Sequence, residues 1–212
     1  MSEYGYIPEA PEQSFGNNKG IFTPKDIYDL TRADKYTNYG QLELIETQTV
    51  SGVSAVNFTS IQESTYNVHF LTFNNITPTA SGFHYHNVRF SNDGGSSYES
   101  SNYQYANQYG GTGFGELRSA SASEVGDLFA LNGNTSTISG NGYIYFYNLG
   151  DSSKYSFTTD QNVVQIDTSS MYMYFGSGVY AQSETINAIQ WFSDSSVTFN
   201  GDFSLYGIKE YS

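Results

Sequence analysis

The sequence contains three histidines, His69, His84 and His86, the side chains best suited to bind a metal ion. His84 and His86 are two residues apart, so in an extended strand their side chains share one face, a suitable geometry for two zinc ligands. His69 is the obvious third ligand. The alternative, which we favour, is that all three are ordinary polar residues near a turn. We therefore expect no metal site and no cofactor.

Carboxylates are numerous enough that a pair at the separation used by glycosidases could arise by folding. The candidates are Glu43, Glu46, Glu63, Glu184 and Asp194. No spacing singles out a pair, and solvated surface carboxylates are the simpler interpretation in an acidic chain. A nucleophile elbow, a phosphate loop and a dinucleotide fingerprint are all missing from the sequence. We expect no catalytic residue and no enzymatic activity.

Aromatic side chains are the distinctive feature, with 20 Tyr and 15 Phe. Aromatic rings on a β-sandwich can stack on sugar rings or form a contact surface between protein copies, where Tyr is also enriched. The candidates for such glycan or interface contacts are Tyr103, Tyr105, Tyr172, Tyr174 and Trp191. For any single Tyr, packing in the core or at a sheet edge remains the default interpretation.

The charge excludes two classes of partner. The chain has 8 basic and 21 acidic residues, a net charge of −13, and Arg118 is the only cation between Phe90 and Ser153. A nucleic-acid groove needs clustered Lys and Arg, and an anionic membrane surface would repel this chain. We therefore expect neither nucleic-acid binding nor membrane insertion.

Cysteine usage and hydropathy narrow the class further. The chain has no cysteine, so it has no disulfide framework and no thiolate metal site. Residues 1–13 have neither a basic head nor an apolar run, which argues against an ordinary secretory signal. No window approaches the roughly 18 apolar residues of a membrane-spanning helix.

The segment most clearly organised as β-structure is residues 142–158, GYIYFYNLGDSSKYSFT. Side chains of a strand alternate between two faces, so its first three tyrosines share one face and Ile144 and Phe146 share the other. The turn-forming residues GDSS follow, and the alternation then resumes. The pattern predicts a β-hairpin.

The chain from residue 41 onward repeats this pattern, which predicts about ten to twelve strands separated by turn residues. Residues 110–125 are rich in Gly, Ser and Ala and are predicted to be a long loop into which Phe114 and Leu117 tuck. No helix is available to cover a parallel sheet. We expect an all-β fold, an antiparallel β-sandwich or jelly roll, over residues 41–212.

Residues 1–40 are predicted to form an N-terminal attachment arm with one short helix. Thr23 has the features of a helix N-cap, with Pro24 at the first helical position and Asp26 three residues on. The arm could order by docking on a neighbouring subunit, or it could be a disordered terminus. The candidate anchoring residues are Tyr4, Tyr6, Ile7, Phe15, Phe22 and Ile27.

Several segments carry a resemblance to a known class of protein. They are GIFTPKDIY, YGQLELIETQTVSGVSAVNFTSI, YNVHFLTFNNI, GYIYFYNLGDSSKYSFTT, MYMYFGSGVY and FSLYGIKEY. The first resembles the short leader of many fibre and accessory structural proteins of marine tailed bacteriophages such as cyanophages. The others resemble the jelly-roll proteins that such phages carry, and together they cover most of residues 20–211.

The resemblance implies a structural part of the particle with no catalytic residues. On this basis we expect a non-enzymatic virion protein, a β-sandwich displayed as tail fibre, neck or capsid decoration and anchored by its N-terminal arm. The expected partners are other virion proteins, further copies of the chain in a homo-oligomer, and a host-surface glycan. The expected location is the virion, assembled in the host cytoplasm, which suits a chain without cysteine. The alternatives are a carbohydrate-binding module that uses exposed aromatic faces and a polysaccharide-degrading enzyme.

Overall fold

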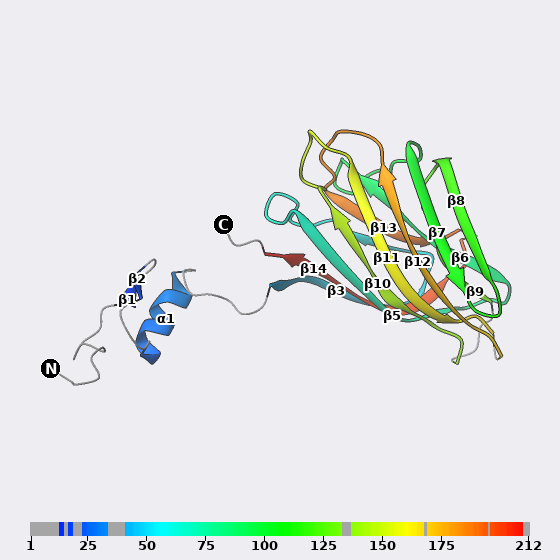
Figure 1. Cartoon of the computed structure of the whole chain (residues 1–212), viewed down its shortest axis with the longest axis horizontal. Coiled ribbons are helices and arrows are strands. Elements are labelled where there is room, and N and C mark those ends of the chain that lie inside the picture. The colour runs from blue at the N-terminus through cyan, green and yellow to red at the C-terminus, as the bar shows by residue number, and fades with distance from the viewer. Residues whose placement is uncertain are drawn as a thin grey trace. The chain divides into compact units, whose positions relative to one another are not determined.

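The computed structural model describes residues 13–14, 17–18, 23–33, 41–132, 137–167, 169–194 and 196–209. The chain divides into two units, Met1–Gln41 and Leu42–Ser212. Figure 1 labels the helix and most of the strands.

The N-terminal unit contains the helix α1 (Pro24–Arg32) and an antiparallel pair of short strands, β1 (Gln13–Ser14) and β2 (Asn17–Asn18). The Thr23 hydroxyl accepts a hydrogen bond from the Asp26 amide (3.2 Å), and the Thr23 amide donates to the Asp26 carboxylate (2.8 Å). This reciprocal capping box confirms the helix start predicted from the sequence. No residue of α1, all of which are described, is buried.

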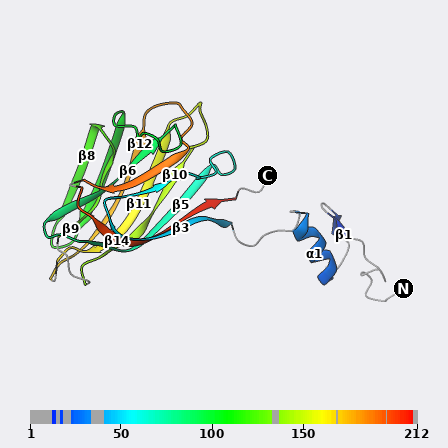
Figure 2. The ribbon, with the colours of Figure 1, turned by 180° about the vertical axis from the view of Figure 1, so that it is seen from behind.

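The second unit consists of two antiparallel sheets. In the described residues the large sheet has eight strands, in spatial order β3 (Leu42–Val53), β14 (Phe199–Ile208), β5 (Val68–Pro78), β10 (Gly140–Tyr147), β11 (Ser156–Gln165), β12 (Met171–Tyr180), β7 (Tyr103–Gly110) and β8 (Phe114–Ala122). The small sheet has four strands there, β4 (Ala55–Phe58), β13 (Ala188–Ser193), β6 (Phe83–Ser91) and β9 (Val125–Asn132). The small sheet packs on one face of the large sheet (Figure 2), which confirms the predicted all-β antiparallel sandwich.

The chain passes between the sheets at both edges of the large sheet. The edge strand β3 leads into β4, and the opposite edge strand β8 leads into β9. Both β4 and β9 are edge strands of the small sheet. As a result β9 packs against β7, β11 and β12 of the large sheet, and its outer backbone edge has no neighbouring strand in the described residues.

Aromatic rings fill much of the space between the sheets. The centre of the fully buried Trp191 ring lies 4.6 Å from that of Phe73 and 5.5 Å from that of Phe203. Phe129 lies 5.4 Å from Phe73 in a stacked arrangement. Each such ring removes roughly 150–250 Å² from water, so a few large aromatic residues build a core with little leucine.

The predicted hairpin of residues 142–158 is confirmed, because β10 pairs with β11 and Tyr147 faces Phe157. Ile144 and Phe146 are fully buried between the sheets. The tyrosines of β10 alternate with them and lie on the opposite side of the large sheet. We call this side, which the small sheet does not cover, the outer face.

The prediction of a long loop over residues 110–125 is wrong, because β8 occupies most of that segment. Its residues pair with β7, with Arg118 opposite Ala106. Phe114, expected to tuck in, is 87% exposed, whereas Leu117 packs against the core. Gly, Ser and Ala have little preference for strands, so the hydrogen bonds to β7 define this strand.

Candidate functional site

Two cross-strand rows on the outer face form an open groove over β11, β12, β7 and β8. Residues that face each other on neighbouring antiparallel strands present their side chains on the same side of the sheet. In strand order the rows are Phe157, Val179 and Gln104, and next to it Thr159, Ser177, Ala106 and Arg118. Pairing across four strands therefore brings together residues from positions 104 to 179 of the chain.

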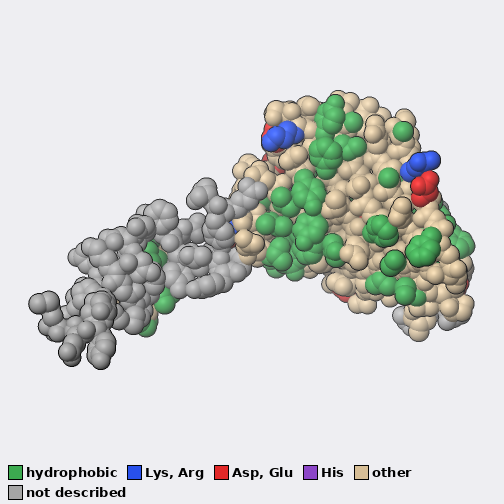
Figure 3. Space-filling view, in the orientation of Figure 1, with side chains coloured by type: hydrophobic (Ala, Val, Ile, Leu, Met, Phe, Trp, Pro, Cys, Tyr) green, Lys and Arg blue, Asp and Glu red, His purple; other side chains and the backbone are tan. Residues whose placement is uncertain are grey.

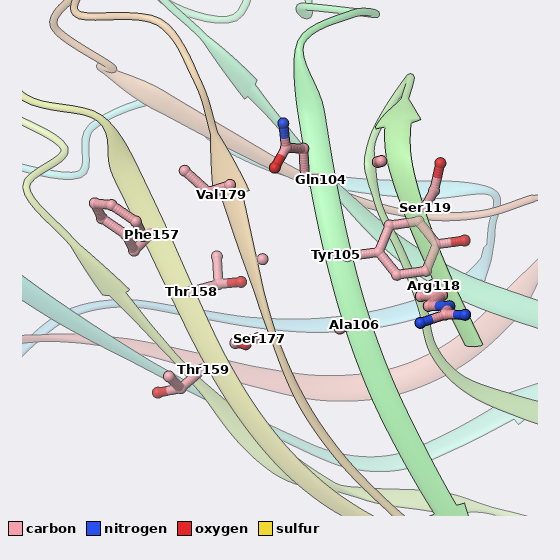
Figure 4. A pocket seen from close by; sticks show the side chains of 12 residues that line it. Gln104, Tyr105, Ala106, Arg118, Ser119, Phe157, Thr158, Thr159, Ser177 and Val179 are labelled. Carbon is pink, nitrogen blue, oxygen red and sulfur yellow. The ribbon is translucent and has the colours of Figure 1, made fainter. Parts of the chain in front are cut away.

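This groove, called the outer groove below, has a volume of about 500 Å³. Small residues of β12 and β7, Ser177, Gly178 and Ala106, lie along its middle. Phe157 and Arg118 stand on its two sides (Figure 4). The volume falls in the range of roughly 300–1,000 Å³ that small-molecule sites occupy.

The outer groove combines an apolar ring with polar groups. The Phe157 side chain is 43% exposed, and the hydroxyls of Thr159 and Ser177 lie in the next row. Arg118 is paired with Glu116 through a 3.4 Å contact, but both side chains are exposed, so the ion pair is weak. Such a surface suits a ligand with apolar faces and hydroxylated edges.

Tyr105 supports the groove from below. It lines the groove, and its hydroxyl donates a hydrogen bond of 2.6 Å to the Asp127 carboxylate. Burial, together with this hydrogen bond, raises the pKa of Tyr105, and burial also raises the pKa of Asp127. The Asp127 amide in turn donates to Asn87 Oδ1 at 2.8 Å. Tyr105 is thus held as a neutral, oriented phenol.

The three histidines do not converge. His69 Nε2 bonds to the Ile61 carbonyl at 2.8 Å, and His84 Nε2 lies 3.2 Å from a different carbonyl, that of residue 81. His86 Nδ1 accepts a hydrogen bond from Trp191 Nε1 at 3.0 Å. Burial lowers the pKa of His86 to about 3 and also lowers that of His69. Among the described residues, no three His, Cys, Asp or Glu side chains are placed to hold a metal ion.

The candidate carboxylates have separate partners. Glu43 accepts a hydrogen bond of 2.6 Å from the Tyr66 hydroxyl, and Glu46 accepts one of 2.9 Å from the amide of a neighbouring glutamine. Glu184 accepts hydrogen bonds from the hydroxyl of Tyr180 and from an asparagine amide. Glu43, Glu46 and Glu184 thus each bond to a different neighbouring side chain, and none of these contacts joins two of the candidate carboxylates.

The large sheet turns a polar row inward from β11. Its buried members are Ser156, Thr158, Asp160 and Asn162. Asn162 Nδ2 donates to the Leu128 carbonyl at 3.0 Å, and Asn107 Nδ2 donates to the Gly126 carbonyl at 2.8 Å. Both carbonyls belong to the edge strand β9. Side-chain amides of the large sheet thus satisfy the unpaired edge of the small sheet, which is a structural role.

Asp160 is the ionisable member of this inward row. Burial raises the pKa of its carboxyl to about 7. Asn162 Nδ2 lies 3.4 Å from Asp160 Oδ2, and Oδ1 has no hydrogen-bond partner in the described part of the chain. A buried carboxyl that titrates near neutrality makes the stability of the fold depend on pH.

The aromatic candidates for ligand contact need correction. Trp191 and Tyr103 are fully buried and Tyr174 is 4% exposed, because all three point between the sheets. Tyr105 and Tyr172 are partly buried and pack against the same core. Trp191, Tyr103 and Tyr174 therefore cannot stack on an external sugar ring in this fold. The exposed aromatic surface consists of other residues.

The anchoring candidates belong to the N-terminal unit. Ile27 lies on α1 and is 36% exposed. The other five lie outside the described residues: Tyr4, Tyr6, Ile7, Phe15 and Phe22. Their anchoring role stays a prediction.

Sequence reasoning named Tyr105 but missed the other residues that line the outer groove. The alternation in residues 155–158 separates Phe157 from Ser156, but it does not tell which face is buried, and here the polar face is inside. Of the other lining residues, only Arg118 stood out in the sequence, because it is the single cation between Phe90 and Ser153. The remaining lining residues are brought together by the order of the strands in the large sheet, which the local sequence does not determine.

The fold and this surface define an all-β sandwich with an open groove on its uncovered sheet. No protein-family model matches the chain, and neither a curated protein nor a solved structure is significantly similar to it. No helix in the described part of the chain has the length and apolar character needed to cross a membrane.

Proposed function

We propose that this protein is a non-enzymatic structural component of a tailed-phage particle. The sandwich is displayed on the particle as part of a tail fibre, the neck or the capsid surface, and the N-terminal unit attaches it to neighbouring virion proteins. The sequence resemblance of residues 20–211 to phage jelly-roll proteins motivates the proposal. The observation that carries it is that α1, described over its full length, buries none of its residues, whereas the sandwich has a complete core of its own.

The helix α1 has the features of an element that docks. Ile27 and Leu30 are three residues apart and share one side of the helix, while Lys25 and Arg32 lie on the opposite side. A helix of nine residues is marginal by itself in water, and most helical stability in proteins comes from packing of an apolar side. An attachment partner would supply that packing.

The double variant Ile27→Glu/Leu30→Glu should therefore fail to enter particles. Burying two such aliphatic side chains contributes about 1.5–3 kcal/mol each, so occupancy should fall on the order of 100-fold or more. Glutamate is a good helix former, which leaves the helix itself intact. The measurement is the amount of this chain in purified particles from cells that supply only the variant.

A matched control is Lys25→Gln/Arg32→Gln, which changes the net charge by the same amount on the opposite side of α1. Its incorporation should equal that of the wild type. Normal incorporation of the Ile27/Leu30 variant would remove the attachment role of the helix.

Binding of a neutral glycan is a second candidate function, which the outer groove favours. Sugar rings present apolar C–H faces and hydroxylated edges, and the groove sets the exposed Phe157 ring beside the hydroxyls of Thr159 and Ser177. A displayed sandwich with many copies on one particle would add avidity for a host surface.

Under this second function, Phe157→Ala should weaken glycan binding about tenfold, equivalent to about 1.4 kcal/mol for loss of one aromatic contact. The side chain is 43% exposed, so the fold should tolerate the change. The measurement is glycan-array screening followed by titration of the best ligand. Phe83→Ala, at a 58% exposed phenylalanine of the small sheet, is the control and should bind normally. Equal binding by Phe157→Ala and wild type, or no bound glycan at all, would contradict this function.

A further inference from the structure

The outer face has a second part, over β3, β14, β5 and β10, with a different character from the outer groove. One cross-strand row runs over six consecutive strands without a charged residue: Leu42, Ile208, Val68, Tyr147, Phe157 and Val179. Figure 3 shows hydrophobic side chains gathered on this side of the sandwich, with few charged side chains among them. We call the part of this surface on β3, β14, β5 and β10 the apolar face.

The adjacent row of the apolar face is a rigid aromatic cluster. It consists of Leu44, Tyr206, Phe70 and Tyr145 in strand order. The Phe70 ring centre lies 4.6 Å from that of Tyr145 and 6.2 Å from that of Tyr206. Because these rings already restrict one another's motion, covering them with a partner costs little further side-chain conformational entropy.

Two tyrosine hydroxyls of β10 are used within the sheet. The Tyr147 hydroxyl lies 3.0 Å from Thr159 Oγ1, and the Tyr143 hydroxyl donates to Gln161 Oε1 at 2.8 Å. The Tyr143 and Tyr147 rings are thus held along the sheet, and their hydroxyls are already hydrogen-bonded. Such a surface suits a flat apolar partner better than a sugar, whose hydroxyls need free hydrogen-bonding groups.

The composition and charge of the apolar face indicate its occupant. With strands about 4.8 Å apart and rows about 7 Å apart, its two rows on four strands span roughly 270 Å², enough for the apolar core of a contact whose polar rim lies on the residues around it. The chain has a net charge of −13, so two copies repel each other over most of their surfaces. These two rows over β3 to β10 contain no charge, and aromatic residues are enriched in interface cores.

We propose that the apolar face is a contact between two copies of this chain, each presenting the same surface to the other. Such an isologous contact needs no second complementary patch. The inference stands apart from the proposed function, because it concerns the sandwich alone and makes no use of the N-terminal unit or of a phage particle.

Analytical ultracentrifugation of the full chain tests this contact. The wild type should sediment as an assembly of two copies of the 23.5 kDa chain. Leu42→Glu/Leu44→Glu should sediment as a single chain, because four carboxylates would meet in the contact. Both leucines are at least half exposed, at 50% and 57%, so the variant should keep its unfolding midpoint, and Leu44→Glu alone serves if it does not.

The matched control is Met171→Glu/Met173→Glu on β12, which adds the same charge at side chains exposed by 55% and 42% on the same sheet. It should assemble like the wild type. A monomeric wild type at high micromolar concentration overturns the proposal. So does a Leu42/Leu44 variant that still assembles, which would place the contact elsewhere, or a control that dissociates equally, which would mean that charge alone drives the effect.

Discussion

Replacing Trp191 with alanine should lower the free energy of unfolding by about 3–5 kcal/mol, the usual cost of truncating a fully buried large aromatic side chain. The indole is fully buried and packs against Phe73, Phe129 and Phe203. It also donates a hydrogen bond to His86. Truncation would leave a cavity between the sheets and an unpaired ring nitrogen.

Urea unfolding followed by far-UV circular dichroism measures this loss, since Trp191 is the only tryptophan and its fluorescence disappears with it. Trp191→Phe should lose less, because it keeps most of the packing and gives up the hydrogen bond. Phe83→Ala, at an exposed site, should change the stability by no more than about 0.5 kcal/mol. A loss below about 1 kcal/mol for Trp191→Ala would mean that the ring is not packed as described.

The burial of Trp191 also determines how ligand-binding data on aromatic variants should be interpreted. A Trp191 variant that no longer binds a glycan has lost its fold, not a contact, because the ring does not reach the surface. Phe157 is the informative position for that question.

Asp160→Asn should stabilise the protein at pH 8 by up to about 4 kcal/mol and remove one of two opposing contributions to its pH dependence. Burial raises the pKa of Asp160 from 3.8 to about 7 in the folded state. A difference of three pKa units corresponds to about 4 kcal/mol. The amide of asparagine has a similar shape and needs no proton to stay neutral.

The sign of the effect follows from proton binding. Between about pH 4 and 7 the folded state holds the Asp160 proton more tightly than the unfolded chain, so this contribution is present at low pH and is lost as pH rises through about 7. His86 acts in the opposite direction: its folded pKa of about 3 lies below 6.5, so its contribution is present above 6.5 and is lost as pH falls. The two contributions oppose each other between about pH 4 and 6.5.

In the wild type these two contributions should largely cancel in that range. In Asp160→Asn the contributions of His86 and His69, whose folded pKa values both lie below 6.5, remain without that of Asp160, so the unfolding free energy should decrease as the pH falls from 6.5 to 4. Denaturant titrations at several pH values measure this, with Glu116→Gln as the control for removing an exposed carboxylate. A variant whose stability follows the wild-type pH curve in parallel would show that Asp160 is not buried as a neutral acid.

Local sequence signals predicted the local elements well. The capping residues Thr23 and Asp26 lie three positions apart, so the helix start could be predicted from neighbours alone. The β10–β11 hairpin followed from alternation and a turn within one segment, and the all-β sandwich followed from its repetition along the chain.

Burial and pairing could not be predicted in the same way. In the inward polar row of β11, Asn162 bonds to the Leu128 carbonyl of β9, an edge strand more than twenty residues earlier, and this contact depends on how the two sheets pack. The outer groove and the apolar face are rows of residues that the order of strands brings together. The outer groove joins two hairpins, β11 with β12 and β7 with β8, through the pairing of β12 with β7, which are distant in the sequence. Within the apolar face, each strand pairs only with strands distant in the sequence, so neither surface has a compact motif.

Electron cryomicroscopy of the tailed-phage particle to which we propose that this chain belongs tests the central proposal most directly, with mass spectrometry of the same preparation to establish that the chain is present. We predict density for the two-sheet sandwich on the outside of the particle, joined through the N-terminal unit to a second virion protein. A chain that is made in the infected cell but is absent from purified particles would contradict the account.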